Sequence, residues 1–139
     1  MTEATDAVEA TLRVGVVGIG VMGSNHARVL REMPGVELVA VADPDPKQAA
    51  FVSGALGCKS VAHVSELIAL GVDAVSIAAP THLHRDIALT CIKAGVHVLV
   101  EKPIAPSVKE GREIIAALSN SQWLAPDHAA RRLSEKCWP

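Results

Sequence analysis

The stretch LRVGVVGIGVMG, residues 12–23, decides how this chain folds. Its first half, residues 12–17, is apolar and β-branched, which predicts a buried strand. The residues from 21 to 33 carry apolar side chains at helical spacing and predict a helix. The segment GIGVMG that joins the two is a complete GxGxxG pattern. The pattern alone is weak, but between a strand and a helix it predicts a turn that holds phosphate groups.

Each glycine of this turn has a physical task. Gly18 allows a tight turn, Gly20 lets a pyrophosphate approach the backbone, and Gly23 lets the helix pack closely against the strand. The start of the helix adds free N–H groups and a partial positive charge. The candidate phosphate-binding residues are therefore Gly18, Ile19, Gly20, Val21, Met22 and Gly23.

Beyond this stretch, short β-branched runs alternate with longer helical patterns as far as residue 118. We expect strands at 12–17, 36–43, 59–62, 73–79 and 96–101, and helices at 21–33, 46–56, 64–70, 83–94 and 107–118. Nearly continuous apolar strands separated by helices predict an α/β fold, a doubly wound parallel sheet of order 3-2-1-4-5. A sixth strand would have to come from residues 122–125.

Asp43 stands twenty residues after Gly23, at the end of the second predicted strand. A carboxylate at this place accepts hydrogen bonds from the adenosine ribose of NAD and repels the 2′-phosphate of NADP. The sequence Pro44-Asp45-Pro46 follows, without a nearby Arg or Lys. We therefore predict NAD as the cofactor. A chance Asp after a glycine turn, or a different nucleotide cofactor such as S-adenosylmethionine, are the alternatives.

Two further segments end predicted strands at the same edge of the sheet. The loop AAPTHLH, residues 78–84, would line the cofactor, since ligands of such sheets lie at the carboxyl ends of the strands. His82 and His84 are spaced like a metal pair, but zinc needs three or four ligands and we expect no metal. The second segment, VLVEKPIA at 98–105, places Glu101 and Lys102 at a strand end, where charges that simply meet water are the plain alternative.

Taken together, RVGVVGIGVMGSNHARVL, VAVADPD, VSIAAPTHLH and AGVHVLVEKPIA resemble the nucleotide-binding half of the Gfo/Idh/MocA oxidoreductases, a Rossmann domain. Among these, the chain is most similar to dehydrogenases that act at C3 of UDP-N-acetylhexosamines. The resemblance covers residues 12–118. It implies that Lys102 is catalytic near the reacting carbinol and that Glu101 binds the nicotinamide ribose. It also implies cofactor contacts from the loop after the fourth strand, at Ala79, Pro80, Thr81 and His84.

The chain departs from this family after residue 118. Family members carry a second α+β domain that holds the substrate, whereas residues 119–139 match the family poorly. We expect 1–11 to be a disordered segment, 12–118 the NAD-binding domain and 119–139 a divergent, truncated tail. The expected partners are a sugar or nucleotide sugar, if a second domain is supplied, and a second copy of the chain in a homo-oligomer. The alternative function is a non-catalytic NAD-binding module, such as a redox sensor or partner subunit.

Composition narrows the remaining classes. A net charge of −2 argues against a nucleic-acid partner. The first eleven residues carry three acids and no base, unlike a signal peptide, and no apolar run is long enough to cross a bilayer. The three cysteines, Cys58, Cys91 and Cys137, are scattered and odd in number, which favours reduced thiols. These features predict a cytoplasmic protein.

Overall fold

The computed structural model describes residues 10–120. In chain order its elements are β1 (Leu12–Val17), α1 (Val21–Glu32), β2 (Val36–Ala42), α2 (Pro46–Leu56), β3 (Lys59–Val61), α3 (Val64–Ala69), β4 (Ala74–Ile77), the 3₁₀ turn η1 (Thr81–Leu83), α4 (His84–Lys93), β5 (His97–Val100) and α5 (Val108–Asn120). The elements alternate as the sequence predicts, and most boundaries agree within two residues. The expected start of the fourth helix at Leu83 is wrong by one residue, because η1 precedes α4.

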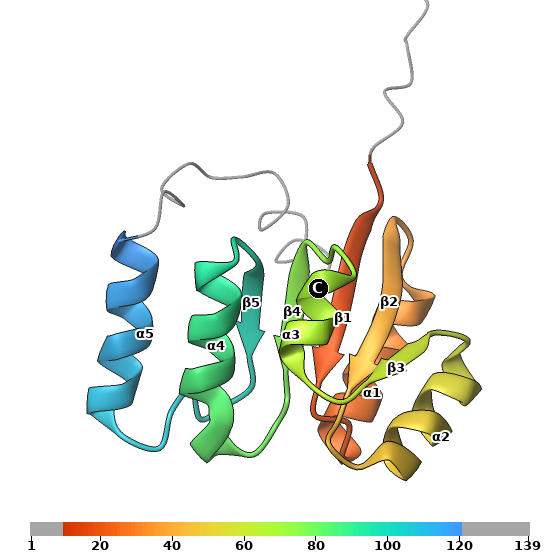
Figure 1. Cartoon of the computed structure of the whole chain (residues 1–139), viewed down its shortest axis with the longest axis horizontal. Coiled ribbons are helices and arrows are strands. Elements are labelled where there is room, and N and C mark those ends of the chain that lie inside the picture. The colour runs from red at the N-terminus through yellow and green to blue at the C-terminus, as the bar shows by residue number, and fades with distance from the viewer. Residues whose placement is uncertain (1–9, 121–139) are drawn as a thin grey trace, which may run out of the picture.

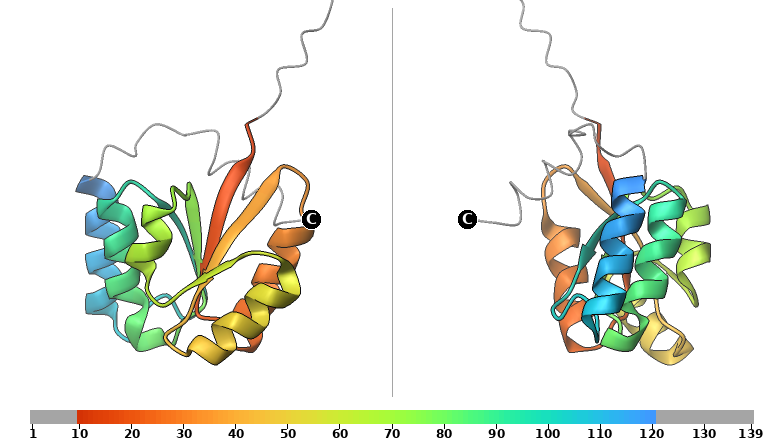
Figure 2. Two further views of the ribbon diagram at one scale, coloured as in Figure 1. Left: turned by 45° about the vertical axis from the view of Figure 1, so that its right-hand side comes forward. Right: turned by 90° about the vertical axis from the view of Figure 1, so that its left-hand side faces the viewer.

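The five strands form one parallel sheet of order β3-β2-β1-β4-β5, which confirms the predicted topology. Helices α1 and α2 cover one face, and α3, α4 and α5 cover the other (Figures 1 and 2). The chain leaves β1 toward β2 on one side and reaches β4 on the other. The carboxyl ends of β1 and β4 therefore flank the position where loops diverge and a ligand can enter.

Each face of the sheet has its own apolar core. Alternate residues of β1 divide between them: Val14 and Val16 pack under α1 and α2, and Val17 packs on the opposite side. Gly15 leaves room on that opposite side for the fully buried side chain of Leu67 from α3, which a Cβ at position 15 would overlap. Small and branched aliphatic residues thus allow the helices to lie close to the sheet.

Helix α5 begins with a capping box formed by Ser107 and Glu110. The Ser107 hydroxyl oxygen accepts a hydrogen bond from the Glu110 amide at 3.2 Å, and the hydroxyl donates to the Glu110 carboxylate at 3.4 Å. The helix runs to Asn120, two residues past the predicted end. The expectations for 121–139, including a sixth strand at 122–125, and for residues 1–9 lie outside the described residues.

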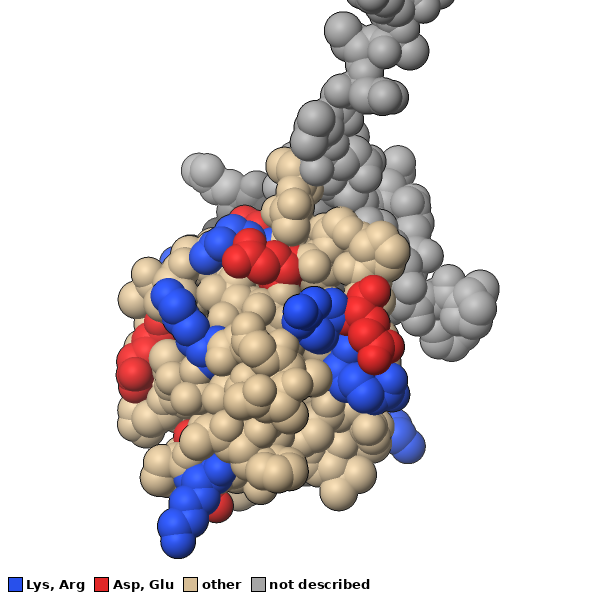
Figure 3. All heavy atoms as spheres, turned by 90° about the vertical axis from the view of Figure 1, so that its right-hand side faces the viewer, with Lys and Arg blue, Asp and Glu red and all other residues tan. Residues whose placement is uncertain are grey.

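The surface and the thiols add little specialised chemistry. On the face that includes α2 and β3, basic and acidic side chains are interspersed (Figure 3). Within residues 10–120, no helix has both the length and the apolarity that a bilayer span requires. Cys58 and Cys91 are free thiols, and burial raises the pKa of the Cys91 thiol to about 12. Cys91 is therefore a protonated core residue at neutral pH.

Candidate functional site

The glycine turn after β1 has the geometry that its pattern predicts. Gly18 has a φ of 82°, and a Cβ there would overlap the backbone of Ala79. A Cβ on Gly23 would overlap the carbonyl oxygen of Gly18, so this residue lets α1 lie against the turn. Gly20 differs from both, because a Cβ there would meet no atom within 4 Å. Glycine at position 20 therefore keeps a space open and serves no packing need.

That space lies at the beginning of α1. Gly20 is the N-cap residue and provides no side-chain cap. The first amides of a helix have no acceptor within the helix, so α1 offers N–H groups at the place that Gly20 leaves open. An anion with several oxygens is the group that such an end binds best.

Asp43 follows β2 and is tied to the glycine turn. Its Oδ2 accepts a hydrogen bond from the Ile19 amide at 3.1 Å, and its Oδ1 accepts one from the Asp45 amide at 2.9 Å. Each carboxylate oxygen can accept a second hydrogen bond. The side chain is thus held in one orientation and keeps acceptor capacity for hydroxyl groups of a ligand.

His84 connects two loops at the carboxyl edge of the sheet. Its side chain is buried, and its Nε2 lies 2.7 Å from the carbonyl oxygen of Ala79. Its Nδ1 lies 3.0 Å from the carbonyl oxygen of Pro103 and 3.2 Å from that of Ile104. Backbone oxygens therefore occupy both ring nitrogens, and the side chain joins the loop after β4 to the loop after β5.

The loop after β5 carries the predicted acid–base residue. The Glu101 amide donates to the carbonyl of Ile77 at 2.9 Å, and the Glu101 Oε2 accepts from the Lys102 amide at 2.9 Å. The backbone on both sides of Glu101 is therefore fixed. The Lys102 side chain is exposed, and no carboxylate among residues 10–120 forms an ion pair with its ammonium group.

These segments surround one cleft of about 590 Å³ at the carboxyl edge of the sheet, lined by Gly18, Gly20, Val21, Met22, Asp43, Ala78, Ala79, Pro80, Thr81, His84, Glu101 and Lys102. Two predicted site residues are not in its lining. Ile19 is buried and contributes its amide to Asp43, and Gly23 packs against Gly18. The predicted residues thus converge from four separate loops.

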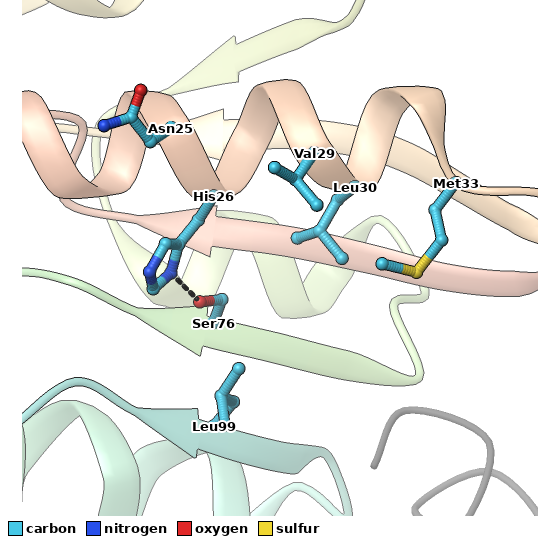
Figure 4. Close-up of a pocket in the computed structure, with 7 residues that line it drawn as sticks. All are labelled: Asn25, His26, Val29, Leu30, Met33, Ser76 and Leu99. Atoms are coloured by element: carbon cyan, nitrogen blue, oxygen red, sulfur yellow. Dashed lines mark hydrogen bonds between the residues drawn. The ribbon is translucent and has the colours of Figure 1, made fainter. Parts of the chain in front are cut away.

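Sequence reasoning missed two groups of residues near this cleft. A second hollow of about 400 Å³ adjoins Asp43 and includes His63, Leu83 and Ile87. The end of β3 next to the end of β2 could have indicated His63, because both strands finish at the same edge. The other missed group is His26 and Ser76, which hydrogen-bond on the α1 face of the sheet (Figure 4). A lone histidine in an amphipathic helix gave no signal.

A metal centre has no support in the described part of the chain. Residues 10–120 contain no group of three or more His, Cys, Asp or Glu placed to hold an ion. Both ring nitrogens of His84, one member of the suggested pair, lie against carbonyl oxygens.

A parallel sheet of this order, a glycine turn at a helix start and an acidic residue ending β2 define a dinucleotide-binding domain of the Rossmann type. Residues 12–125 match the Gfo/Idh/MocA family, described as an oxidoreductase family with an NAD-binding Rossmann fold. The chain belongs to this family.

The relatives include inositol dehydrogenases and nucleotide-sugar dehydrogenases. Inositol 2-dehydrogenase 1 of Saccharopolyspora erythraea is 41% identical over 110 residues, which are 76% of this chain and 33% of that protein. UDP-N-acetylglucosamine 3-dehydrogenase from Acidithiobacillus ferrooxidans is 36% identical with a TM-score of 0.73, covering 78% of this chain and 35% of that one. The WlbA dehydrogenase from Bordetella pertussis, solved with NADH and UDP-GlcNAcA, is 31% identical with a TM-score of 0.73, covering 78% and 34%.

The chain therefore spans about a third of the length of these relatives. The expected family is confirmed. The narrower expectation of a nucleotide-sugar dehydrogenase is not confirmed, because the inositol 2-dehydrogenase is 41% identical and the nucleotide-sugar enzyme 36%. The comparisons support the family level.

Proposed function

We propose that this chain is the NAD(H)-binding domain of an oxidoreductase that transfers a hydride between NAD and a hydroxyl-bearing carbon of a sugar or nucleotide sugar. The observation that carries the proposal is the convergence in one cleft of the open space at Gly20, the Asp43 carboxylate and the Lys102 side chain, which has no ion-pair partner among residues 10–120. The structure with NADH of the related Bordetella protein supports the same assignment.

The residues of the cleft suit successive parts of a dinucleotide. The start of α1 and the space at Gly20 suit the pyrophosphate, because amides there have no other acceptor. Asp43 suits the hydroxyls of the adenosine ribose and opposes a 2′-phosphate, which favours NAD(H) over NADP(H). Glu101 suits the second ribose. His84 acts indirectly in this proposal, by fixing Ala79 and Pro103 on either side of the cleft.

Bound NAD⁺ would accept the hydride, and Lys102 would act as the general acid–base group that accepts or donates the hydroxyl proton. The Lys102 side chain is exposed at the cleft and has no carboxylate partner among the described residues, so it is available to a substrate hydroxyl. As the carbon loses hydride, the hydroxyl proton passes to Lys102 in its neutral amine form, and the ammonium group that results returns the proton in the reverse reaction.

The substrate itself needs more than this cleft. The relatives are about three times as long as the matched region. Hydride transfer requires the protein to hold the substrate carbon close to the nicotinamide and in the right orientation. We expect the 139-residue chain to bind NAD(H) and to show no enzyme-like oxidation of sugars. Rapid NADH formation by this chain from a UDP-sugar would contradict that division of labour.

Calorimetric titration of the 139-residue chain with NADH, NADPH and ADP tests the binding part. We expect NADH and ADP to bind and NADPH to bind more weakly, and equal affinity for NADPH would refute the assignment of Asp43. The catalytic part is tested by joining the chain to the second domain of a relative. In that fusion, Lys102→Ala should reduce turnover by about 10²–10⁴-fold with little change in NADH affinity.

A further inference from the structure

Three side chains form a hydrogen-bonded row across the α1 face of the sheet. The Ser76 hydroxyl of β4 lies 2.8 Å from Nδ1 of His26 on α1 (Figure 4). On the other side of the ring, Nε2 of His26 lies 3.1 Å from Oε1 of Glu101. Ser76 is buried, and the side chains of His26 and Glu101 are each 23% exposed. The row begins in an apolar hollow lined by Val29, Leu30, Met33 and Leu99. It ends at the loop Glu101-Lys102-Pro103 after β5, called the EKP loop below.

The chemistry of the groups fixes the direction of these bonds. As a carboxylate, Glu101 can only accept, so the hydrogen lies on Nε2 of His26. In the neutral ring Nδ1 then accepts, and the Ser76 hydroxyl donates to it. The imidazole is therefore held from both sides, and its orientation follows from two bonds rather than from packing alone.

The same three residue types form the triad of hydrolases, but the surroundings differ. Ser76 lies within β4, which pairs with β1 on one side and β5 on the other. Its side chain is almost fully buried, and the backbone N–H groups beside it are used by the sheet, so they are not available to stabilise an oxyanion. The row is better explained by what it does to Glu101.

Glu101 uses its two carboxylate oxygens differently. Oε1 accepts from His26, and Oε2 accepts from the backbone amide of Lys102 at 2.9 Å. Rotation of the carboxylate would break both bonds, so the histidine and the lysine amide together determine its plane. The proposed ribose-binding oxygens and the backbone of the proposed acid–base residue are therefore set by one contact from α1.

We infer that His26 is a positioning residue, which acts through Glu101 and orients the carboxylate for the nicotinamide ribose. The inference rests on the proposed function. Helix α1 would then serve both halves of the cleft. Its first amides face the proposed pyrophosphate site, and its His26 contacts Glu101 at the proposed nicotinamide ribose site. The affinity of a ligand that lacks the nicotinamide nucleoside, such as ADP, should not depend on His26.

A double-mutant cycle tests this. NADH and ADP are titrated into the 139-residue chain and its His26→Ala, Glu101→Ala and doubly substituted variants, with thermal unfolding monitored for each. We expect His26→Ala to weaken NADH binding by about 3–10-fold and to leave the affinity for ADP unchanged. In the Glu101→Ala background, His26→Ala should cause no further loss of NADH affinity. Asn25→Ala, at an exposed position of the same helix, is the matched control. His26→Gln, whose amide can still donate to Glu101, should restore part of the affinity.

Nitrogen-15 NMR of the histidine rings gives a readout that does not need a ligand. We expect His26 to be the tautomer with hydrogen on Nε2, with a ring signal that shifts in Glu101→Gln. Three results would overturn the inference and leave the proposed function standing. They are a hydrogen on Nδ1 instead of Nε2, an equal loss of affinity for NADH and ADP in His26→Ala, and additive losses of NADH affinity in the cycle. Failure of the parent chain to bind either nucleotide overturns both.

Discussion

Substitution of Gly20 by valine separates folding from binding. The position has a φ of −67°, which any residue adopts, and a Cβ would meet no atom within 4 Å. Gly20 is the N-cap residue of α1, where glycine is preferred to valine, so we expect the free energy of unfolding to fall by only about 1 kcal/mol. The new side chain would occupy the space proposed for the pyrophosphate. Loss of two hydrogen bonds to a charged group costs about 3 kcal/mol or more, which weakens NADH about 100-fold or more.

Calorimetry with NADH and ADP measures the binding loss, and urea unfolding measures stability. The variant should lose affinity for both NADH and ADP, because both contain the pyrophosphate group. Gly54→Val is the matched control, because Gly54 lies within α2 and its Cβ would also meet no atom within 4 Å. A folded Gly20→Val variant that binds NADH as tightly as the parent chain would refute the placement of the pyrophosphate at α1.

Three further predictions concern the ribose, the core and a buried thiol. Asp43→Ala should weaken NADH binding by about 1–3 kcal/mol and reduce the difference in affinity between NADH and NADPH, both measured by calorimetry. An unchanged preference for NADH would contradict the role of the carboxylate. Leu67→Ala should lower the free energy of unfolding by about 2–5 kcal/mol, because the fully buried side chain fills the space beside Gly15. Burial raises the pKa of the Cys91 thiol from 9.0 to about 12, so above pH 9 the unfolded chain loses this proton while the folded chain keeps it. Stability should therefore fall with rising pH by about 1.4 kcal/mol per pH unit between these values, and denaturation of Cys91→Ala should lack that part of the fall.

Strand order was predictable because it follows from local patterns. Apolar runs and helical periodicity separate the elements, and short right-handed connections leave few arrangements for a parallel sheet. The residues around the cleft were predictable for the same reason, since strands β1, β2, β4 and β5 end at one edge and their following loops meet there.

Contacts that depend on side-chain direction across long separations were not predictable. His26 and Ser76 are 50 residues apart in sequence, and His26 and Glu101 are 75 apart. Their meeting depends on which face of β4 carries Ser76 and on the rotation of α1. His84 illustrates the complementary case. Its place at the cleft follows from the loop, whereas its burial against three carbonyl oxygens follows from how the EKP loop folds back.

The buried ring of His84 makes the two loops mechanically dependent. Carbonyl oxygens of Ala79 and of the Pro103–Ile104 segment lie against opposite ring nitrogens of this one side chain, so opening either loop exposes an imidazole that is now 1% accessible and loosens its contact with the other loop. Such segments open together as one cooperative unit. We therefore expect the two walls of the cleft to loosen together, so that a ligand that orders the loop after β4 also orders the loop that carries Lys102.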